Sequence, residues 1–175
     1  RSEASRVLVA IPVSHGMTPP PNGSLHKTCL TRESDLPFPD LSIDRILMIH
    51  AVECAETMRP MMREIWRVLS GNGRLLVIAP NRRGIWARLE HTPFGYGRPY
   101  TSSQLSRLLR ETLFKPVHGS AALYAPPARS RMILSSAPAI EKLGKRWFPA
   151  VGGIISVEAK KEIYCATPLE QGARQ

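Results

Sequence analysis

The stretch Leu36–Glu53, with the sequence LPFPDLSIDRILMIHAVE, decides how the rest of the chain is interpreted. Its first part, Leu36–Asp40, carries two prolines and predicts a turn, and the unbroken apolar run Ile46–Ile49 follows shortly after it. An apolar run this short, ending abruptly at the polar His50, is typical of a strand buried on both faces. Such strands belong to parallel α/β sheets, where ligands bind just beyond the carboxyl ends of the strands. We therefore expect His50–Glu53 to lie at a ligand-binding edge of a sheet.

The chain is long and apolar enough for one domain with its own core, because 43% of its 175 residues are hydrophobic. No run in it approaches the roughly 18 apolar residues that span a bilayer. Its three cysteines are too widely spaced for a disulfide framework or a zinc site, which favours free thiols in a reducing compartment. We expect a cytoplasmic protein without a bound metal, with one domain over residues 1–166 and a frayed tail over residues 167–175.

The net charge of the chain is +10, from 24 lysines and arginines against 14 aspartates and glutamates. A basic balance of this size favours anionic partners, which include nucleic acid, a phosphorylated substrate and an acidic membrane surface. The charges are spread along the chain, and many basic surfaces have no specific partner. The charge therefore leaves both the partner and the oligomeric state open.

Strands and helices alternate along the sequence, which predicts an α/β fold. Short runs rich in β-branched and other apolar residues, bounded by proline and glycine, predict the strands. The expected strands cover residues 6–12, 25–30, 44–49, 75–79, 117–124 and 154–165, and the last two are expected to pair.

Three helices are expected. Apolar residues recur at helical spacing over residues 54–69, and the glycines of Gly71–Gly73 are expected to cap the end of this helix. Thr101 and Gln104 have the spacing of a capping box, which predicts the start of a second helix. Residues 140–148 predict a short basic amphipathic helix. The buried face of the second helix is expected to consist of Leu105, Leu108, Leu109 and Leu113.

The turn and strand of Leu36–Glu53, followed by REIWRVLSGNGRLLVIAPN at Arg63–Asn81, resemble the class I, Rossmann-like S-adenosylmethionine-dependent methyltransferases. Within that class they are most similar to the broad group that includes the quinone-biosynthesis methyltransferases. The resemblance is strongest over Asp35–Phe114, and it implies a doubly wound, mostly parallel sheet closed by an antiparallel pair of late strands. It also implies S-adenosylmethionine as the cofactor and a small-molecule or macromolecular methyl acceptor, for which the basic charge favours an anionic one.

The chain departs from this family at its amino-terminal side. In the family a first strand runs into a glycine-rich turn and a helix, and that turn holds the methionine end of the cofactor. No such strand, turn and helix occur in this sequence, and Ile11–Ser14 lacks the acid that usually binds the cofactor's ribose. We therefore expect the first strand, turn and helix to precede Arg1 in the complete protein, with that strand in the middle of the sheet.

The resemblance places the cofactor against the loop before the turn and against the end of the strand. Glu33 or Asp35 would accept from the adenine amino group, with a solvated loop acid as the alternative. His50 is the candidate to face the transferred methyl group, as a base or as a polar contact. The alternatives are that His50 bonds the first turn of the next helix and that Glu53 caps this helix. The expected cofactor-binding residues are Glu33, Asp35, Leu36, Ile49, His50 and Ala51.

The segment after the strand at residues 75–79 is the candidate acceptor site. Arginines interleaved with aromatic residues can stack on a ring and pair with a phosphate or carboxylate, while the alternative is a solvated lid. The position after a parallel strand favours a functional role. The expected acceptor-binding residues are Asn81, Arg82, Arg83, Trp86, Arg98 and Tyr100.

Three functions fit these observations. The first is a methyltransferase, in which alignment of the reactants matters more than acid–base help, so that no catalytic triad is expected. The second is a non-catalytic, basic nucleic-acid-binding protein on a degenerate methyltransferase fold. A third and weaker hypothesis is association with a membrane surface through residues 140–148, which would suit a lipidic acceptor.

Overall fold

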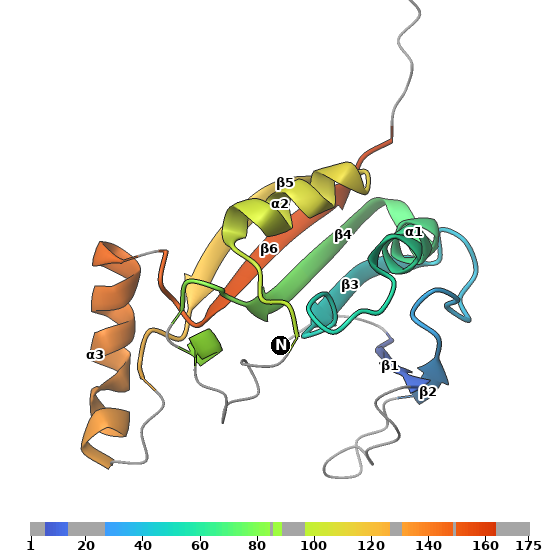
Figure 1. Cartoon of the computed structure of the whole chain (residues 1–175). Coiled ribbons are helices and arrows are strands. Elements are labelled where there is room, and N and C mark those ends of the chain that lie inside the picture. Colours follow the sequence, from blue (N-terminus) through green and yellow to red (C-terminus); the bar gives the residue numbers. More distant parts are fainter. Residues whose placement is uncertain are drawn as a thin grey trace, which may run out of the picture.

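The computed structural model describes residues 6–13, 27–84, 86–88, 97–126, 131–148 and 150–163 (Figure 1). The predicted tail at residues 167–175 and much of the expected acceptor loop lie outside the described residues. From β3 onward, strands alternate with α-helices as predicted, which confirms the α/β class. The elements are β1 (Leu8–Pro12), β2 (Lys27–Thr31), β3 (Ile43–Ile49), α1 (Met58–Val68), β4 (Leu69–Pro80), a short 3₁₀ helix (Trp86–Arg88), α2 (Ser102–Glu111), β5 (Phe114–Ala122), α3 (Arg131–Trp147) and β6 (Ile154–Lys161).

Four of these strands form a mixed sheet in the order β3-β4-β6-β5. β3 and β4 are parallel, with Ile46 opposite Leu75 and Met48 opposite Val77. β6 runs antiparallel to both β4 and β5, which confirms the predicted pairing of the two late strands. β1 and β2 form a separate sheet of two parallel strands, so that β1 and β3 each keep one unpaired edge in the described structure.

One face of the four-stranded sheet is covered by α1 and α2 (Figure 1). Met62 of α1 and Leu105 of α2 are completely buried against it, so the methionine-rich stripe of α1 is core. The core cluster also contains Met48, Val52, Met61, Ile65, Leu69, Leu75, Val77, Ala79, Leu109, Phe114, Ile155, Val157 and Ala159.

The opposite face of β3 and β4 is exposed. Leu47 and Ile49 on β3 are 55% and 56% exposed, and Leu76, which lies opposite Leu47 on β4, is 36% exposed. Successive side chains of a strand point to opposite faces, so Met48 enters the core while its two neighbours point away from it. The prediction that this strand is buried on both faces is therefore wrong for the structure as described.

The start of α1 lies later than predicted. The helix begins at Met58, with Thr57 as its N-cap residue, and not at Cys54. Pro60 fits the first turn because the backbone N–H groups there have no partner inside the helix. The residues between His50 and α1 therefore form a turn at the end of β3.

The end of α1 also differs from the prediction. Leu69 is already extended and pairs with Ile43, so the helix passes directly into β4. The predicted glycine cap at Gly71–Gly73 is wrong, because these residues lie inside β4. Gly73 permits close packing instead, since a Cβ at this position would lie 2.5 Å from Leu69 Cγ.

α2 begins as predicted, because Thr101 and Gln104 make both hydrogen bonds of the capping box. Leu105 and Leu109 form its buried face. Leu113 lies beyond the helix, is exposed and has a φ of 65°, so its predicted place on the buried face is wrong.

α3 is longer than the predicted helix at residues 140–148 and contains Pro138, which removes one backbone hydrogen bond. No helix in the described part of the chain is long and apolar enough to cross a membrane.

Candidate functional site

His50 is the first residue after β3, and its backbone is strained. Its φ of 54° lies in the left-handed region, which costs a non-glycine residue roughly 1–2 kcal/mol. The His50 N–H donates to Ile78 O at 3.0 Å, which extends the β3–β4 ladder and holds the residue in place. Strain that the surrounding structure maintains is concentrated at binding and active sites. This observation supports the prediction that His50 belongs to a functional site.

The His50 side chain pairs with Glu53. His50 Nδ1 lies 2.5 Å from Glu53 Oε1, and the Glu53 side chain is only 2% exposed. An ionised carboxylate at this distance makes Nδ1 the protonated ring nitrogen and leaves the lone pair on Nε2. The alternative that Glu53 caps the next helix is wrong, because α1 has no side-chain cap. Glu53 instead orients the imidazole.

The second carboxylate oxygen of Glu53, Oε2, is a buried acceptor that lacks a hydrogen-bond donor in the described structure. Leaving a buried acceptor unsatisfied costs about 1–3 kcal/mol or more, and such groups in native proteins usually have a functional explanation. A donor supplied by a ligand or by another segment would remove this cost.

The segment Gly97–Tyr100 packs against the His50–Glu53 turn. The Arg98 N–H donates to Glu53 O at 3.0 Å. Gly97 has a φ of 81°, and a Cβ on it would lie 2.6 Å from Glu53 O, so glycine is required here. Burial raises the pKa of Tyr100, while the charge of Arg98 lowers it and that of Glu53 raises it further. Arg98 and Tyr100 therefore share one electrostatic environment with the His50–Glu53 pair.

Asn81 is buried at the end of β4, and its side chain holds the local backbone in place through hydrogen bonds. Its Nδ2 group donates to Ala150 O at 2.9 Å and to Gly152 O at 2.7 Å, and its Oδ1 accepts from the Arg83 N–H at 3.1 Å. Both amide donors are thus engaged within the protein. A contact between Asn81 and the acceptor stays a prediction.

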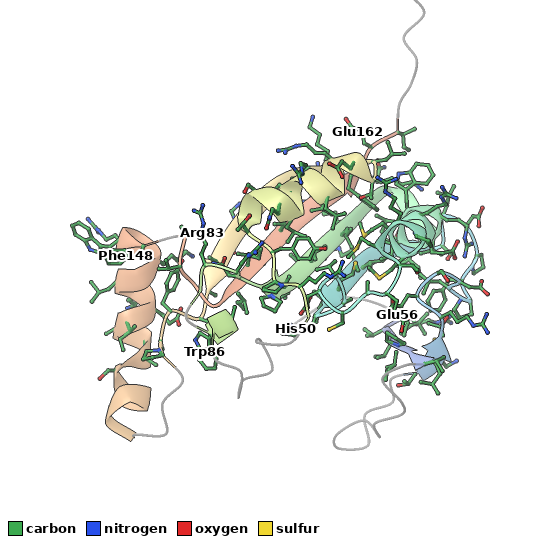
Figure 2. The ribbon with its side chains drawn as sticks, viewed as in Figure 1. His50, Glu56, Arg83, Trp86, Phe148 and Glu162 are labelled. Carbon is green, nitrogen blue, oxygen red and sulfur yellow. The ribbon has the colours of Figure 1, made fainter. Side chains whose placement is uncertain are left out.

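The remaining acceptor-binding candidates lie nearer α3 (Figure 2). Trp86 Nε1 donates to Ala125 O at 2.9 Å, and a Cβ on Gly153 would lie 2.5 Å from Trp86 Cδ1. Arg82 and Arg83 are exposed on the adjoining turn. The structure therefore brings Arg98 to the backbone of Glu53, and the Arg82 N–H donates to Tyr100 O at 2.9 Å, so the turn after β4 lies against the same segment.

A hollow of ≈ 240 Å³ lies between the ends of β1 and β2 and the start of α1. Glu33, one of the predicted cofactor-binding residues, lines it. Glu56, from the turn before α1, lines it as well, and Figure 2 shows Glu56 between α1 and the β1–β2 pair. The other lining residues are Pro12, Val13, Thr31, Arg32, Ser34 and Thr57.

The neighbouring predicted residues Asp35 and Leu36 do not line this hollow. The Leu36 N–H donates to Glu64 Oε2 at 3.0 Å, and Arg67 donates to Leu36 O at 3.0 Å. The Arg67 guanidinium lowers the pKa of Glu64, and Glu64 in turn raises the pKa of Arg67. Arg67 also bonds Phe38 O and Asp40 Oδ1. The predicted turn at Leu36–Asp40 is therefore confirmed, and it is fixed to α1.

The turn between β3 and α1 joins the hollow to the His50–Glu53 pair. Cys54 lies between Glu53 and Glu56, and burial, together with the charges of Glu53 and Glu33, raises its pKa. The other two strand-end candidates offer no polar side chain: Ile49 points to the exposed face, and Ala51 packs against the core. Among Ile49, His50 and Ala51, only His50 has a side chain that can accept a proton or bind a polar group.

The residues around the hollow include acceptors of the kind that the adenosine half of S-adenosylmethionine needs. The carboxylates of Glu33 and Glu56 are acceptors for ribose hydroxyls and for the adenine amino group. The sequence offers no glycine-rich turn after a strand to supply backbone donors for the methionine half. Within the described ranges, no group of three or more histidine, cysteine, aspartate or glutamate side chains is arranged to hold a metal ion.

The described residues form an α/β fold with a mixed sheet, and comparisons with known proteins relate it to the Rossmann-like methyltransferase fold. Residues 14–77 match the family model of the methyltransferase domain. No curated protein sequence matches the chain.

Solved structures give the same fold. A S-adenosylmethionine-dependent methyltransferase from Thermotoga maritima, described as a possible histamine N-methyltransferase, is 16% identical with a TM-score of 0.60, over 78% of this chain and 64% of its own. One from Archaeoglobus fulgidus is 15% identical with a TM-score of 0.57, over 78% of this chain and 68% of its own. The [4+2]-cyclase SpnF is 20% identical with a TM-score of 0.53, over 79% of this chain and 57% of its own.

The chain therefore has the fold of the class I S-adenosylmethionine-dependent methyltransferases, and its residues 14–77 are similar to the methyltransferase-domain family. It spans less than two thirds of the Thermotoga protein's length. Since a cyclase shares the fold, the reaction has to be argued from the site.

Sequence reasoning missed Glu56 and the role of Gly97. Glu56 belongs to a turn that was expected to be helix, so its place beside the hollow was not foreseen. Gly97 has a positive φ, which glycine adopts without steric cost, and a lone glycine in an irregular segment is the only signal that the sequence gives for it.

Proposed function

We propose that the protein is a S-adenosylmethionine-dependent methyltransferase whose acceptor binds at the carboxyl end of β3. The observation that carries the proposal is the strained, carboxylate-oriented His50 at the strand end, joined by one short turn to a polar hollow that suits adenosine. The fold and the domain segment at residues 14–77 support the same reaction. We place the protein in the cytoplasm.

S-adenosylmethionine supplies an electrophilic methyl group on a sulfonium. In this proposal Glu33 and Glu56 hold the adenosine end, which fixes the direction from which the methyl group arrives. Glu53 holds the His50 ring so that Nε2 faces the acceptor and accepts its proton. The acceptor is therefore a group that loses a proton when it is methylated, such as a hydroxyl or an amine.

Two groups of side chains would position the acceptor. Arg98 and Tyr100 lie beside the pair, within reach of an anionic or ring-shaped acceptor. Arg82 and Arg83 are exposed at the end of β4 and would hold a more distant anionic group. The acceptor's identity is not specified by these residues.

The unpaired edges and the open face of the sheet support a second proposal, which concerns residues upstream of Arg1. β1 and β3 each have an unpaired edge in the described structure, and Leu47 and Ile49 are exposed on the open face. Unpaired edges and exposed apolar strands are unfavourable in an isolated domain. We propose that a strand, followed by a glycine-rich turn and a helix, from residues before Arg1 fills the space between β1 and β3 and covers this face.

The test of the reaction uses transfer of a labelled methyl group from S-adenosylmethionine to small-molecule and macromolecular extracts of the source cells. The enzyme extended by its upstream residues should label a product, and His50→Asn should lower the rate about 100-fold or more. The affinity for S-adenosylhomocysteine should stay within about twofold, since His50 acts on the acceptor.

Glu53→Gln is the companion variant, because it keeps the shape of the side chain and removes its charge. The rate should fall with Glu53→Gln, because the neutral amide fixes the tautomer and orientation of the His50 ring less firmly than the carboxylate does. An unchanged rate in His50→Asn would contradict the assigned role of His50, and the absence of any labelled product would contradict the reaction itself.

A further inference from the structure

α3 stands at one end of the molecule, beyond β5 and β6 and away from α1 and α2 (Figure 1). It is attached through a narrow face. The Glu141 carboxylate accepts hydrogen bonds from the N–H groups of Leu123, Tyr124 and Ala125 at 3.2, 2.6 and 3.1 Å. Gly144 packs directly on the Tyr124 ring, where there is no room for a side chain. Glu141 and Gly144 thus mark the attached side of the helix.

The rest of the carboxyl-terminal half of α3 carries large apolar side chains in contact with solvent. Leu143, Trp147 and the following Phe148 are 59%, 69% and 65% exposed. Leu143 and Trp147 are four residues apart, so they lie on one face of the helix. Figure 2 shows Phe148 at the carboxyl-terminal end of α3.

The same surface is basic. Lys142, Lys145 and Arg146 are exposed beside the apolar residues. The nearby acid Glu141 is occupied by three backbone donors, so it does not neutralise them. The outer side of α3 therefore combines exposed aromatic and aliphatic groups with uncompensated positive charge.

An anionic membrane surface satisfies both features together. Lipid phosphates pair with the lysines and the arginine, and the boundary of the acyl chains takes up Leu143, Trp147 and Phe148. Tryptophan in particular is favoured at the membrane–water interface. Duplex nucleic acid would satisfy the charges through its phosphates but would leave the apolar side chains in water, because its bases are already stacked.

We propose that residues 140–148 bind the surface of membranes that contain anionic phospholipids, with α3 in the headgroup layer and the rest of the protein outside it. The inference concerns a surface remote from the His50–Glu53 pair, and it does not depend on the proposed reaction. A surface-bound enzyme of this kind would meet acceptors that reside in the membrane.

Co-sedimentation with vesicles tests this proposal. The chain should bind vesicles of phosphatidylcholine with about one-third phosphatidylglycerol, should not bind phosphatidylcholine alone, and should be released by salt. Lys142→Gln combined with Lys145→Gln should lower the partition coefficient about thirtyfold, which corresponds to about 1 kcal/mol for each basic residue at the surface.

The matched control is Arg107→Gln with Arg110→Gln on α2, which makes the same change in net charge at exposed positions of another helix. It should change the partition coefficient less than about threefold, because these residues lie away from the membrane and act only through screened, long-range charge. An equal loss in both double variants would overturn the assignment to α3.

Tryptophan fluorescence provides a readout that does not need a destabilising variant. Emission of the unaltered chain should shift to shorter wavelength on anionic vesicles and be quenched by nitroxide-labelled lipids. Trp147→Phe should retain binding and lose most of the shift. Binding that is equally strong to neutral vesicles, an absence of binding, or a loss of vesicle binding in favour of duplex DNA would each overturn the proposal.

Discussion

The four-stranded sheet has one packed face and one open face. Met62, Leu75 and Leu105 are completely buried on the first, whereas Leu47 and Ile49 stay more than half exposed on the second. The same strands supply apolar side chains to both faces, so the difference in exposure comes from the helices that cover one face. In the chain, α1 lies between β3 and β4, and α2 lies between β4 and β5. Both helices cover one face, and no described helix covers the other.

This difference also divides the candidate site. The His50–Glu53 pair, Arg98 and Tyr100 are built from the packed half of the molecule and are held by its backbone bonds. The hollow lined by Glu33 and Glu56 lies next to the β1–β2 pair, whose strands are not hydrogen-bonded to β3. In the proposed methyltransferase, the described chain holds the adenosine end of the cofactor and the acceptor, and an upstream strand and turn complete the site.

The largest expected effect compares one residue from each face. Met62→Ala should lower the free energy of unfolding by about 2–5 kcal/mol, because it leaves a cavity in the packed core. Leu47→Ala should change it by less than about 0.5 kcal/mol, because its side chain is exposed. Urea denaturation of the 175-residue chain measures both. A loss of several kcal/mol with Leu47→Ala would mean that the open face is covered in solution.

A smaller effect should follow from removing the cap of a helix that covers the packed face. The Thr101 hydroxyl accepts from the Gln104 N–H at 3.2 Å, and Gln104 Oε1 accepts from the Thr101 N–H at 3.0 Å. Thr101→Ala should cost about 1 kcal/mol in urea denaturation. Ser106→Ala, within the same helix but away from the cap, is the control, and an equal loss there would remove the cap from the explanation.

The smallest effect concerns the turn that α1 anchors. The hydrogen bond from Arg67 lowers the pKa of Glu64 below its ordinary value of 4.5. A carboxyl group with a lowered pKa in the folded state stabilises the fold above its unfolded pKa, and this contribution disappears as the pH falls through the folded value. Glu64→Gln should therefore lower the urea midpoint slightly at pH 7 and not at acid pH. A difference that is independent of pH would contradict the ion-pair explanation.

Features that depend on neighbouring residues could be predicted from the sequence, and features that depend on distant segments could not. The capping box at Thr101 and Gln104 and the apolar stripe around Met62 are local patterns, and both are confirmed. The exposure of Leu47 was not predictable, since an apolar strand looks the same whether or not a second layer covers it.

The site shows the same limit. His50 could be singled out because it ends an apolar run, but its pairing with Glu53 follows from a left-handed backbone conformation that no local pattern announces. Likewise Gly73 looks like a helix cap, and only the position of the Leu69 side chain shows that it serves close packing in β4. In both cases the geometry of the backbone, and not the type of residue, decides the structure.

Calorimetric titration with S-adenosylhomocysteine shows whether the cofactor site needs the upstream strand and turn, when the 175-residue chain is compared with the same chain extended by its upstream residues. We predict no measurable binding to the 175-residue chain, because losing several charge-assisted hydrogen bonds of about 1.5–3 kcal/mol each moves a micromolar dissociation constant beyond millimolar. The extended chain should bind at micromolar concentration, and Glu33→Gln in it should weaken binding about tenfold or more. A micromolar isotherm with the 175-residue chain alone would contradict the account.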